Sequence, residues 1–247
     1  MKNIDKLRKE IDLIDNRILN LLKSRSKLAL EIGRLKKVAL DDTNLFRPER
    51  QVEILKRLFS KKNNLLREED IFKFWREVFS HQTSLQGKLE FLAPNYLNTL
   101  EKEIILHSFG SDIHINFFED INKAFFSTKR KNNMLLILPF PGKLKRSNWW
   151  LNRTFKHLFI LASIPFISKA KSFPKLLVVS KHEPILEGQL SFIYKSSCEQ
   201  NNKNFNKIVK LKSNYLYISN ILLKNKYLKL LGAYPNLDIT NNNEKNK

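Results

Sequence analysis

Two cations lie on a helical face that is otherwise apolar, in the segment RSKLALEIGRLKK at residues 25–37. Arg25 falls in line with leucine and isoleucine positions, and Lys36 follows eleven residues later. On a helix these positions are about 20° apart around the axis and roughly 16 Å apart along it. Two long side chains could therefore lean toward one anion between them. Such an anion would offset the cost of burying unpaired positive charge.

The other candidate groups are cations and neutral amides. Arg47 and Arg50 flank Pro48 at the predicted start of a second helix, and Gln82 and Gln86 are one turn apart near the end of a third. The sequence contains no CxxC or HExxH motif and no glycine-rich phosphate loop, so neither a metal nor a cofactor is expected. A site without a base or nucleophile favours a reaction driven by binding, conformational restriction and electrostatics.

Arg8 predicts a second copy of the chain. It lies seventeen residues before Arg25, which places the two about 25 Å apart along one helix and turned by about 100°. One chain cannot easily bring both to one small ligand, whereas an antiparallel partner helix could. The apolar face of this predicted helix, called the seam below, is also roughly 50 Å long, which is longer than one small domain needs. We therefore predict a homodimer with shared sites.

Hydrophobic periodicity predicts a multidomain chain. Residues 1–87 are expected to be all helical, with helices over 3–37, 48–62 and 69–86, the last ending at Gly87. After Gly87 the hydrophobic pattern changes from a helical period to short apolar runs. These runs predict a small α/β or α+β domain over 88–237. The predicted strands lie at 88–93, 113–118, 134–140, 158–164, 175–180, 190–196, 214–220 and 227–234, and the predicted helices at 119–126 and 147–157. Residues 238–247 are expected to be a disordered tail.

Composition limits the class of protein. The 247 residues carry a net charge of +21, but the basic residues are spread along the whole chain without a basic–aromatic repeat, so a nucleic-acid partner is not expected. The longest apolar runs are too short to span a membrane, and the single cysteine, Cys198, fits the reducing cytoplasm. Trp149, Trp150 and His81 are expected to pack rather than react.

Three segments carry a specific resemblance: LRKEIDLIDNRILNLLKSRSKLALEIGRLK, RPERQVEILKRL and FWREVFSHQTSLQ. Together they are similar to the all-helical chorismate mutases, in which three helices per chain intertwine into a dimer that converts chorismate to prephenate without a cofactor. The resemblance implies that Arg25 grips one substrate carboxylate and that Arg8 reaches the other from the partner chain. It implies that Lys36 and Gln86 donate to the ether oxygen and that Arg50 lines the carboxylate side of the pocket.

Two positions depart from the family pattern. Gln51 stands where the family usually has the glutamate that holds the substrate hydroxyl, so this contact loses its charge but keeps an acceptor. Gln82 stands where relatives often have a small hydroxyl or an apolar residue. Both nevertheless remain candidate substrate-binding residues.

The second domain resembles a shortened prephenate dehydratase followed by an ACT-like closing strand, as fused to chorismate mutase in some alphaproteobacteria. The segments LEFLAP and YLKLLGAYPN carry that likeness, but the dehydratase's Thr-Arg-Phe signature is missing and the comparable region reads SFPKLLVVS. We therefore predict a chorismate mutase without dehydratase activity. A bifunctional mutase–dehydratase and a basic binding or regulatory homologue remain the alternatives.

Overall fold

The chain begins with three helices. The computed structural model describes residues 3–38, 44–110, 113–169, 174–201 and 203–239. The helices are α1 (Ile4–Val38), α2 (Pro48–Phe59) and α3 (Glu68–Gln86). The all-helical prediction is confirmed, including the start at Pro48 and the end before Gly87. Only α2 is shorter than predicted, because its backbone continues past Phe59 in i→i+3 turns, such as the one from Lys61 N to Leu58 O.

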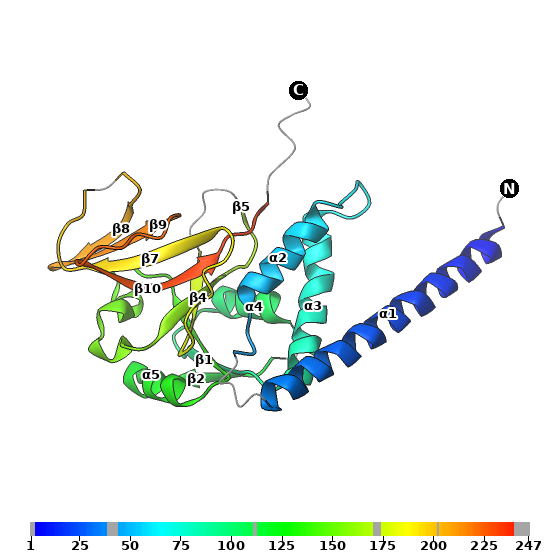
Figure 1. Ribbon diagram of the computed structural model, residues 1–247, viewed down its shortest axis with the longest axis horizontal. Helices are drawn as coiled ribbons and strands as arrows, with labels where there is room; N and C mark the ends of the chain where they lie inside the picture. The colour runs from blue at the N-terminus through cyan, green and yellow to red at the C-terminus, as the bar shows by residue number, and fades with distance from the viewer. Residues whose placement is uncertain (1–2, 39–43, 111–112, 170–173, 202, 240–247) are drawn as a thin grey trace, which may run out of the picture.

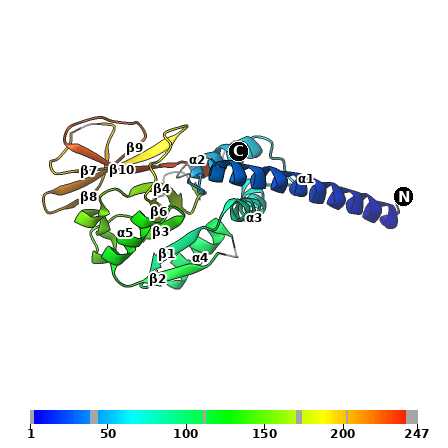
Figure 2. The ribbon, with the colours of Figure 1, turned by 60° about the horizontal axis from the view of Figure 1, so that its bottom comes forward.

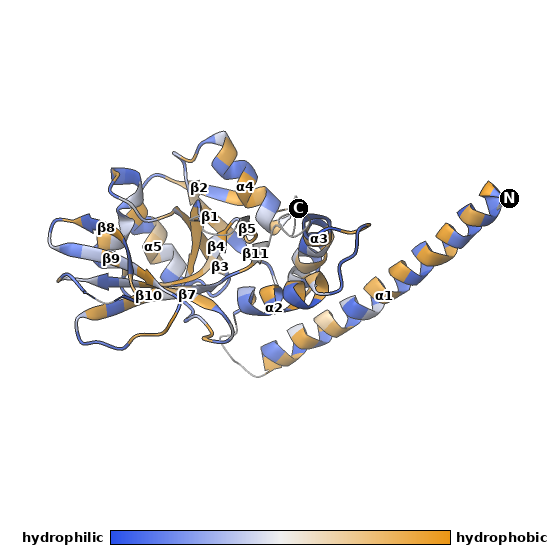
Figure 3. Ribbon diagram, turned by 90° about the horizontal axis from the view of Figure 1, so that it is seen from above, coloured by the Kyte–Doolittle hydropathy of each residue, from blue (hydrophilic) through white to orange (hydrophobic). Residues whose placement is uncertain are grey.

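Helix α1 is an arm that leaves the rest of the molecule (Figures 1 and 2). Only its C-terminal part contacts α3, and its buried residues are Ala29 and Gly33. The predicted apolar seam does not form this contact, since Leu21 and Leu28 remain 70% and 67% exposed. Figure 3 shows apolar residues recurring along the whole arm. The face of α1 that packs on α3, with Ala29 and Gly33, therefore lies next to the seam. The seam itself has no partner within the described chain.

The second domain is built on one mixed sheet. Its strands are β1 (Glu90–Pro94), β2 (Ile115–Phe118), β3 (Met134–Pro139), β4 (Phe159–Ile164), β6 (Leu176–Ser180), β7 (Leu190–Ser196), β8 (Asn206–Leu211), β9 (Asn214–Ser219) and β10 (Leu228–Pro235). Their order across the sheet is β2-β1-β3-β6-β4-β10-β7-β9-β8. The β2-β1-β3 end is parallel, whereas the β10-β7-β9-β8 end is antiparallel. The predicted α/β class is confirmed.

Helices cover the parallel end of the sheet on both faces. On one face α4 (Thr99–Phe109) buries Ile105 and Phe109, and on the other α5 (Ile121–Arg130) buries Ala124 and Phe125. Phe46, two residues before α2, is almost fully buried against Phe109 and Phe166, with its ring centroid 5.5 and 6.1 Å from theirs. This shared core fixes the α2–α3 pair onto the α/β domain.

All eight predicted strands and the predicted helix at 119–126 are confirmed. Strand β8 was not predicted. Two expectations need correction, the helix at 147–157 and the tail from residue 238. The predicted helix at 147–157 is instead a series of short 3₁₀ turns, η1 (Lys145–Ser147), η2 (Trp149–Leu151) and η3 (Arg153–Phe155). The side chain of Asn152 accepts a hydrogen bond from Thr154 N and caps the start of η3. A new turn therefore begins there, and a continuous helix is interrupted. Helix α4 was not predicted, although Asn98 and Glu101 form a capping box at its start.

The end of the chain also differs from its prediction. Strand β11 (Asp238–Ile239) pairs with β5 (Ser168–Lys169), so the expected disordered tail does not begin at residue 238. The remainder of that predicted tail, 240–247, lies outside the described residues. None of the helices in the described segments is long and apolar enough to cross a membrane.

Candidate active site

Lys36 and Gln86 form the centre of the candidate site. Lys36 Nζ lies 3.2 Å from Gln86 Oε1 and 3.4 Å from the backbone oxygen of Asn44, and all three positions are half-buried. Burial lowers the pKa of the Lys36 ammonium below its usual value, and the positive charge of Arg47 lowers it further. The two side chains that were predicted to donate to one oxygen are therefore within hydrogen-bonding distance of each other, although fifty residues separate them in sequence.

Arg25 lies at the border between the α3 contact and the open seam. Its Cζ is 5.8 Å from the centroid of the Phe79 ring on α3. Burial lowers the pKa of the Arg25 guanidinium, and the charge of Arg50 lowers it further. Within the part of the chain that the structure describes, neither Arg25 nor Lys36 forms an ion pair with an acidic side chain. The site thus holds half-buried cations that a bound anion would stabilise.

Gln82 connects α3 to α1. Its Nε2 donates to Ser26 Oγ over 2.9 Å, and its backbone oxygen accepts from Gln86 Nε2 at 3.4 Å. The side chain is 5% exposed, and its Oε1 has no hydrogen-bond partner among the described residues. A buried carbonyl oxygen without a donor is costly, so a ligand hydroxyl at this place would be favoured.

The two candidates on α2 are placed differently from each other. Arg50 is exposed and its Nη1 lies 2.5 Å from Glu53 Oε2, although its charge still acts on Arg25. Gln51 is half-buried and lines a cleft of about 980 Å³ between α3 and the α/β domain. Arg25, Lys36 and Gln86 do not line this cleft. The described chain therefore does not bring Gln51 together with the Lys36–Gln86 pair.

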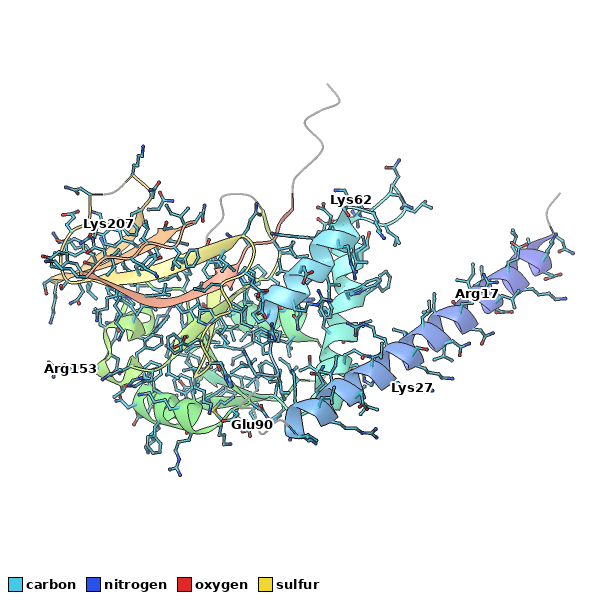
Figure 4. The ribbon with its side chains drawn as sticks, viewed as in Figure 1. Arg17, Lys27, Lys62, Glu90, Arg153 and Lys207 are labelled. Atoms are coloured by element: carbon cyan, nitrogen blue, oxygen red, sulfur yellow. The ribbon has the colours of Figure 1, made fainter. Side chains whose placement is uncertain are left out.

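Arg8 stands apart from the other candidates. It lies in the exposed first turns of the α1 arm, where its Nη1 is 3.5 Å from Asp5 Oδ1. Figure 4 shows the side chains of Arg17 and Lys27 spread along the same arm, away from the rest of the fold. One copy of the chain thus joins Lys36, Gln86 and Gln82 by hydrogen bonds, with Arg25 over Phe79 one turn away on α3, and leaves Arg8 outside this cluster.

Residues 7–87 match the family described as chorismate mutase type II. These residues form a type II chorismate mutase domain. The resemblance found in the sequence is confirmed, and the family is one of isomerases. Among the described residues, no group of three or more His, Cys, Asp or Glu side chains could hold a metal ion.

Curated relatives carry a second activity in their names. The chain is 30% identical over 151 residues to a bifunctional chorismate mutase/prephenate dehydratase of Aquifex aeolicus, covering 59% of this chain and 41% of the relative. It is 27% identical over 155 residues to one of Neisseria gonorrhoeae, covering 63% of this chain and 41% of the relative. These alignments are longer than the chorismate mutase domain, so they continue into the second domain. The chain spans about two fifths of the length of these relatives.

A solved structure gives a weaker likeness. The prephenate dehydratase of Streptococcus mutans matches 62% of this chain and 100% of its own, with a TM-score of 0.39 and 12% identity.

The sequence patterns did not reveal the residues that position the candidate site. Ala29 and Gly33 let α1 approach α3 closely, Ser26 holds Gln82, and the backbone of Asn44 accepts from Lys36. Ala29 and Gly33 are two small residues four positions apart, and this spacing was the one sign in the sequence of a close helix–helix contact. His81, expected to pack, is exposed and lines the cleft between the domains, whereas Trp149 and Trp150 are buried as predicted.

Gly33→Ala is expected to destabilise the protein, although alanine is the better helix former. A Cβ at Gly33 would lie 2.9 Å from Gln86 Cα, a backbone atom that cannot turn aside. We expect the clash to outweigh the helix-propensity gain and to lower the free energy of unfolding by about 1–3 kcal/mol. Urea denaturation measures this, with the exposed Ser24→Ala as the control. A variant as stable as the unmodified protein would show that α1 does not pack this closely on α3.

Proposed function

We propose that this chain is a chorismate mutase that converts chorismate to prephenate by a cofactor-free rearrangement, in phenylalanine and tyrosine biosynthesis. The observation that carries the proposal is the contact between Lys36 Nζ and Gln86 Oε1 inside a domain of the type II family. Negative charge grows on the substrate's ether oxygen as its C–O bond breaks. Donors aimed at that oxygen stabilise the transition state more than the ground state. In the structure Lys36 Nζ donates to Gln86 Oε1, and Gln86 Nε2 donates to the backbone oxygen of Gln82.

The substrate's two carboxylates account for the remaining cations. Arg25 is proposed to hold one carboxylate through a two-pronged contact, with Arg50 adding positive charge beside it. Gln51 and Gln82 are proposed to contact the substrate through their amides, and the orphaned Oε1 of Gln82 supports an acceptor role. Arg8 is proposed to hold the second carboxylate from a second copy of the chain.

A homodimer is proposed to complete the site. The arm of α1 exposes isoleucine and leucine side chains along its length, with Ile4, Ile11, Leu21 and Leu28 between 56% and 70% exposed. An apolar stripe of this length is typical of a helix that packs on another helix. An antiparallel copy would cover the seam and carry its Arg8 toward Arg25 and Lys36.

Replacing Lys36 with methionine tests the chemistry. We expect kcat for the loss of chorismate absorbance to fall by about 10²–10³-fold, because one donor to the developing oxyanion is removed. Lys37→Met, at the exposed next position, is the matched control and should retain full activity. Prephenate is identified by mass. If Lys36→Met and Lys37→Met lose activity equally, Lys36 has no catalytic role. If the unmodified protein does not turn over chorismate, the binding or regulatory alternative replaces the enzyme.

Dehydratase activity is the second candidate, because the relatives that align with both domains are named for it. We propose that this chain lacks it. The comparable region SFPKLLVVS lacks the threonine and arginine of the signature, and Leu176–Ser180 within it is a fully buried strand, β6. Formation of phenylpyruvate from prephenate by the purified protein would contradict this proposal.

The single cysteine fits a cytoplasmic enzyme.

A further inference from the structure

A second cavity lies where the 3₁₀ turns meet the antiparallel end of the sheet. Its volume is about 280 Å³, and it is lined by residues of η2, η3, β7 and β10. Trp150, Phe155 and Leu231 are its buried apolar residues. Figure 4 places Arg153, one of its lining residues, on the side of the α/β domain opposite to α1. The cavity is therefore separate from the chorismate mutase site.

The charged residues of this cavity are all basic. Arg153, Lys156, Lys195 and Lys229 line it, and its lining contains no acidic side chain. None of the four forms an ion pair with an acidic residue that the structure describes. This differs from other basic residues of the same domain, such as Lys131 and Lys207, which pair with Glu90 and Glu199 over 2.6 and 2.5 Å. The fold supplies acidic partners elsewhere and leaves these four cations without them.

Two of the lysines repel each other across the sheet. Lys195 on β7 and Lys229 on β10 are directly opposite in the antiparallel register, so both side chains lie on the same face. Like charges in this arrangement destabilise a sheet. Lys195 Nζ lies 5.8 Å from the Trp150 ring centroid, and burial, followed by the charge of Lys229, lowers its pKa. An anion between the two ammonium groups would turn repulsion into attraction.

The indole of Trp150 is a second feature that the fold does not explain. The neighbouring Trp149 donates its Nε1–H to Pro139 O over 2.8 Å. Trp150 is 1% exposed, yet its Nε1 has no acceptor in the described segments. A buried donor without a partner is destabilising. The cavity therefore combines two features that weaken the unliganded fold, a repelling lysine pair and an unsatisfied indole.

We propose that this cavity binds a small organic anion that carries a flat apolar body and at least one carboxylate or phosphate group with two or more negative charges in all. The apolar body would contact Trp150 and Phe155, and the charged groups would lie between Lys195 and Lys229 and toward Arg153. The volume suits a single small molecule and is too small for a nucleic-acid strand.

Calorimetric titration of the full-length protein at low salt tests the proposal with two probes, isophthalate and phenyl phosphate. These separate a carboxylate source from a phosphate source, and neutral benzamide controls for apolar contact alone. We expect one anionic probe to bind once per chain and benzamide not to bind. Lys195→Gln and Lys229→Gln should each weaken binding by about tenfold or more. Lys210→Gln is the matched control, since Lys210 also lies over an aromatic ring, Tyr215, but outside the cavity.

The unfolding temperature of each variant is measured without a probe. This shows whether a loss of probe binding comes from a folding defect. Lys229→Gln removes the repulsion across β7 and β10, so we expect it to unfold at an equal or higher temperature than the unmodified protein while losing probe binding. The proposal is overturned if neither anion binds with a dissociation constant below about 1 mM, or if both lysine variants bind as the unmodified protein does. It is also overturned if single-stranded RNA binds with a steep salt dependence and neither probe displaces it.

Discussion

Arg25→Ala is expected to lower kcat/KM for chorismate by about a thousandfold. Removing one partner of a desolvated, hydrogen-bonded charge pair typically costs about 2–5 kcal/mol, and each 1.4 kcal/mol is tenfold. Arg25 is half-buried over the Phe79 ring, is repelled by Arg50, and has no acidic partner among the described residues. A substrate carboxylate would be its first counter-ion, so most of the effect should come from substrate binding and orientation.

The stability of the same variant separates a functional role from a structural one. If Arg25 serves only the ligand, its removal relieves an unpaired charge, and the free energy of unfolding of Arg25→Ala should be unchanged or higher. Lys27→Ala is the matched control, because Lys27 is exposed on the opposite side of the same helix and should leave both activity and stability unchanged. Arg25→Lys keeps the charge but loses the two-pronged contact, so intermediate activity is expected. A stable Arg25→Ala variant within tenfold of full activity would remove Arg25 from the proposed site.

Two inactive variants are expected to restore activity to each other. Arg8→Ala and Arg25→Ala should each be severely impaired alone. In a heterodimer purified through two different tags, one site combines the intact Arg25 of one chain with the intact Arg8 of the other. The second site lacks both. We expect about half the activity of the unmodified dimer, because one of two symmetric sites is complete.

The matched control for this experiment is a heterodimer of Arg25→Ala with Lys36→Met. Both residues belong to the cluster that one chain forms by itself, so neither site of this heterodimer is complete and activity should stay low. Restored activity in the control, or none in the Arg8 and Arg25 pair, would show that the sites are not shared in this way. A monomeric protein by sedimentation would also exclude the arrangement.

Much of the fold was predictable from local patterns. The 3.6-residue period identified all three N-terminal helices, Pro48 and Gly87 marked two of their ends, and apolar runs located eight strands. The failures were also local. Asn148 and Asn152 lie between the 3₁₀ turns of 145–155, where the predicted helix is interrupted, and the capping box at Asn98 was overlooked. Residue types and spacing also identified Arg25, Lys36 and Gln86 as candidates, since a cation in an apolar seam is conspicuous in any sequence.

The amino-acid pattern alone was enough to predict the three N-terminal helices, eight of the strands, and which polar groups are out of place on an apolar face. The folded structure was needed to show that Ala29 and Gly33, rather than the leucine seam beside them, contact α3 and bring Lys36 to Gln86. It also decided the strand order and the pairing of Lys195 with Lys229. The physical reason is that periodicity reports which face of an element is apolar. It does not report which distant element covers that face, because that choice depends on the close approach of backbones far apart in the chain.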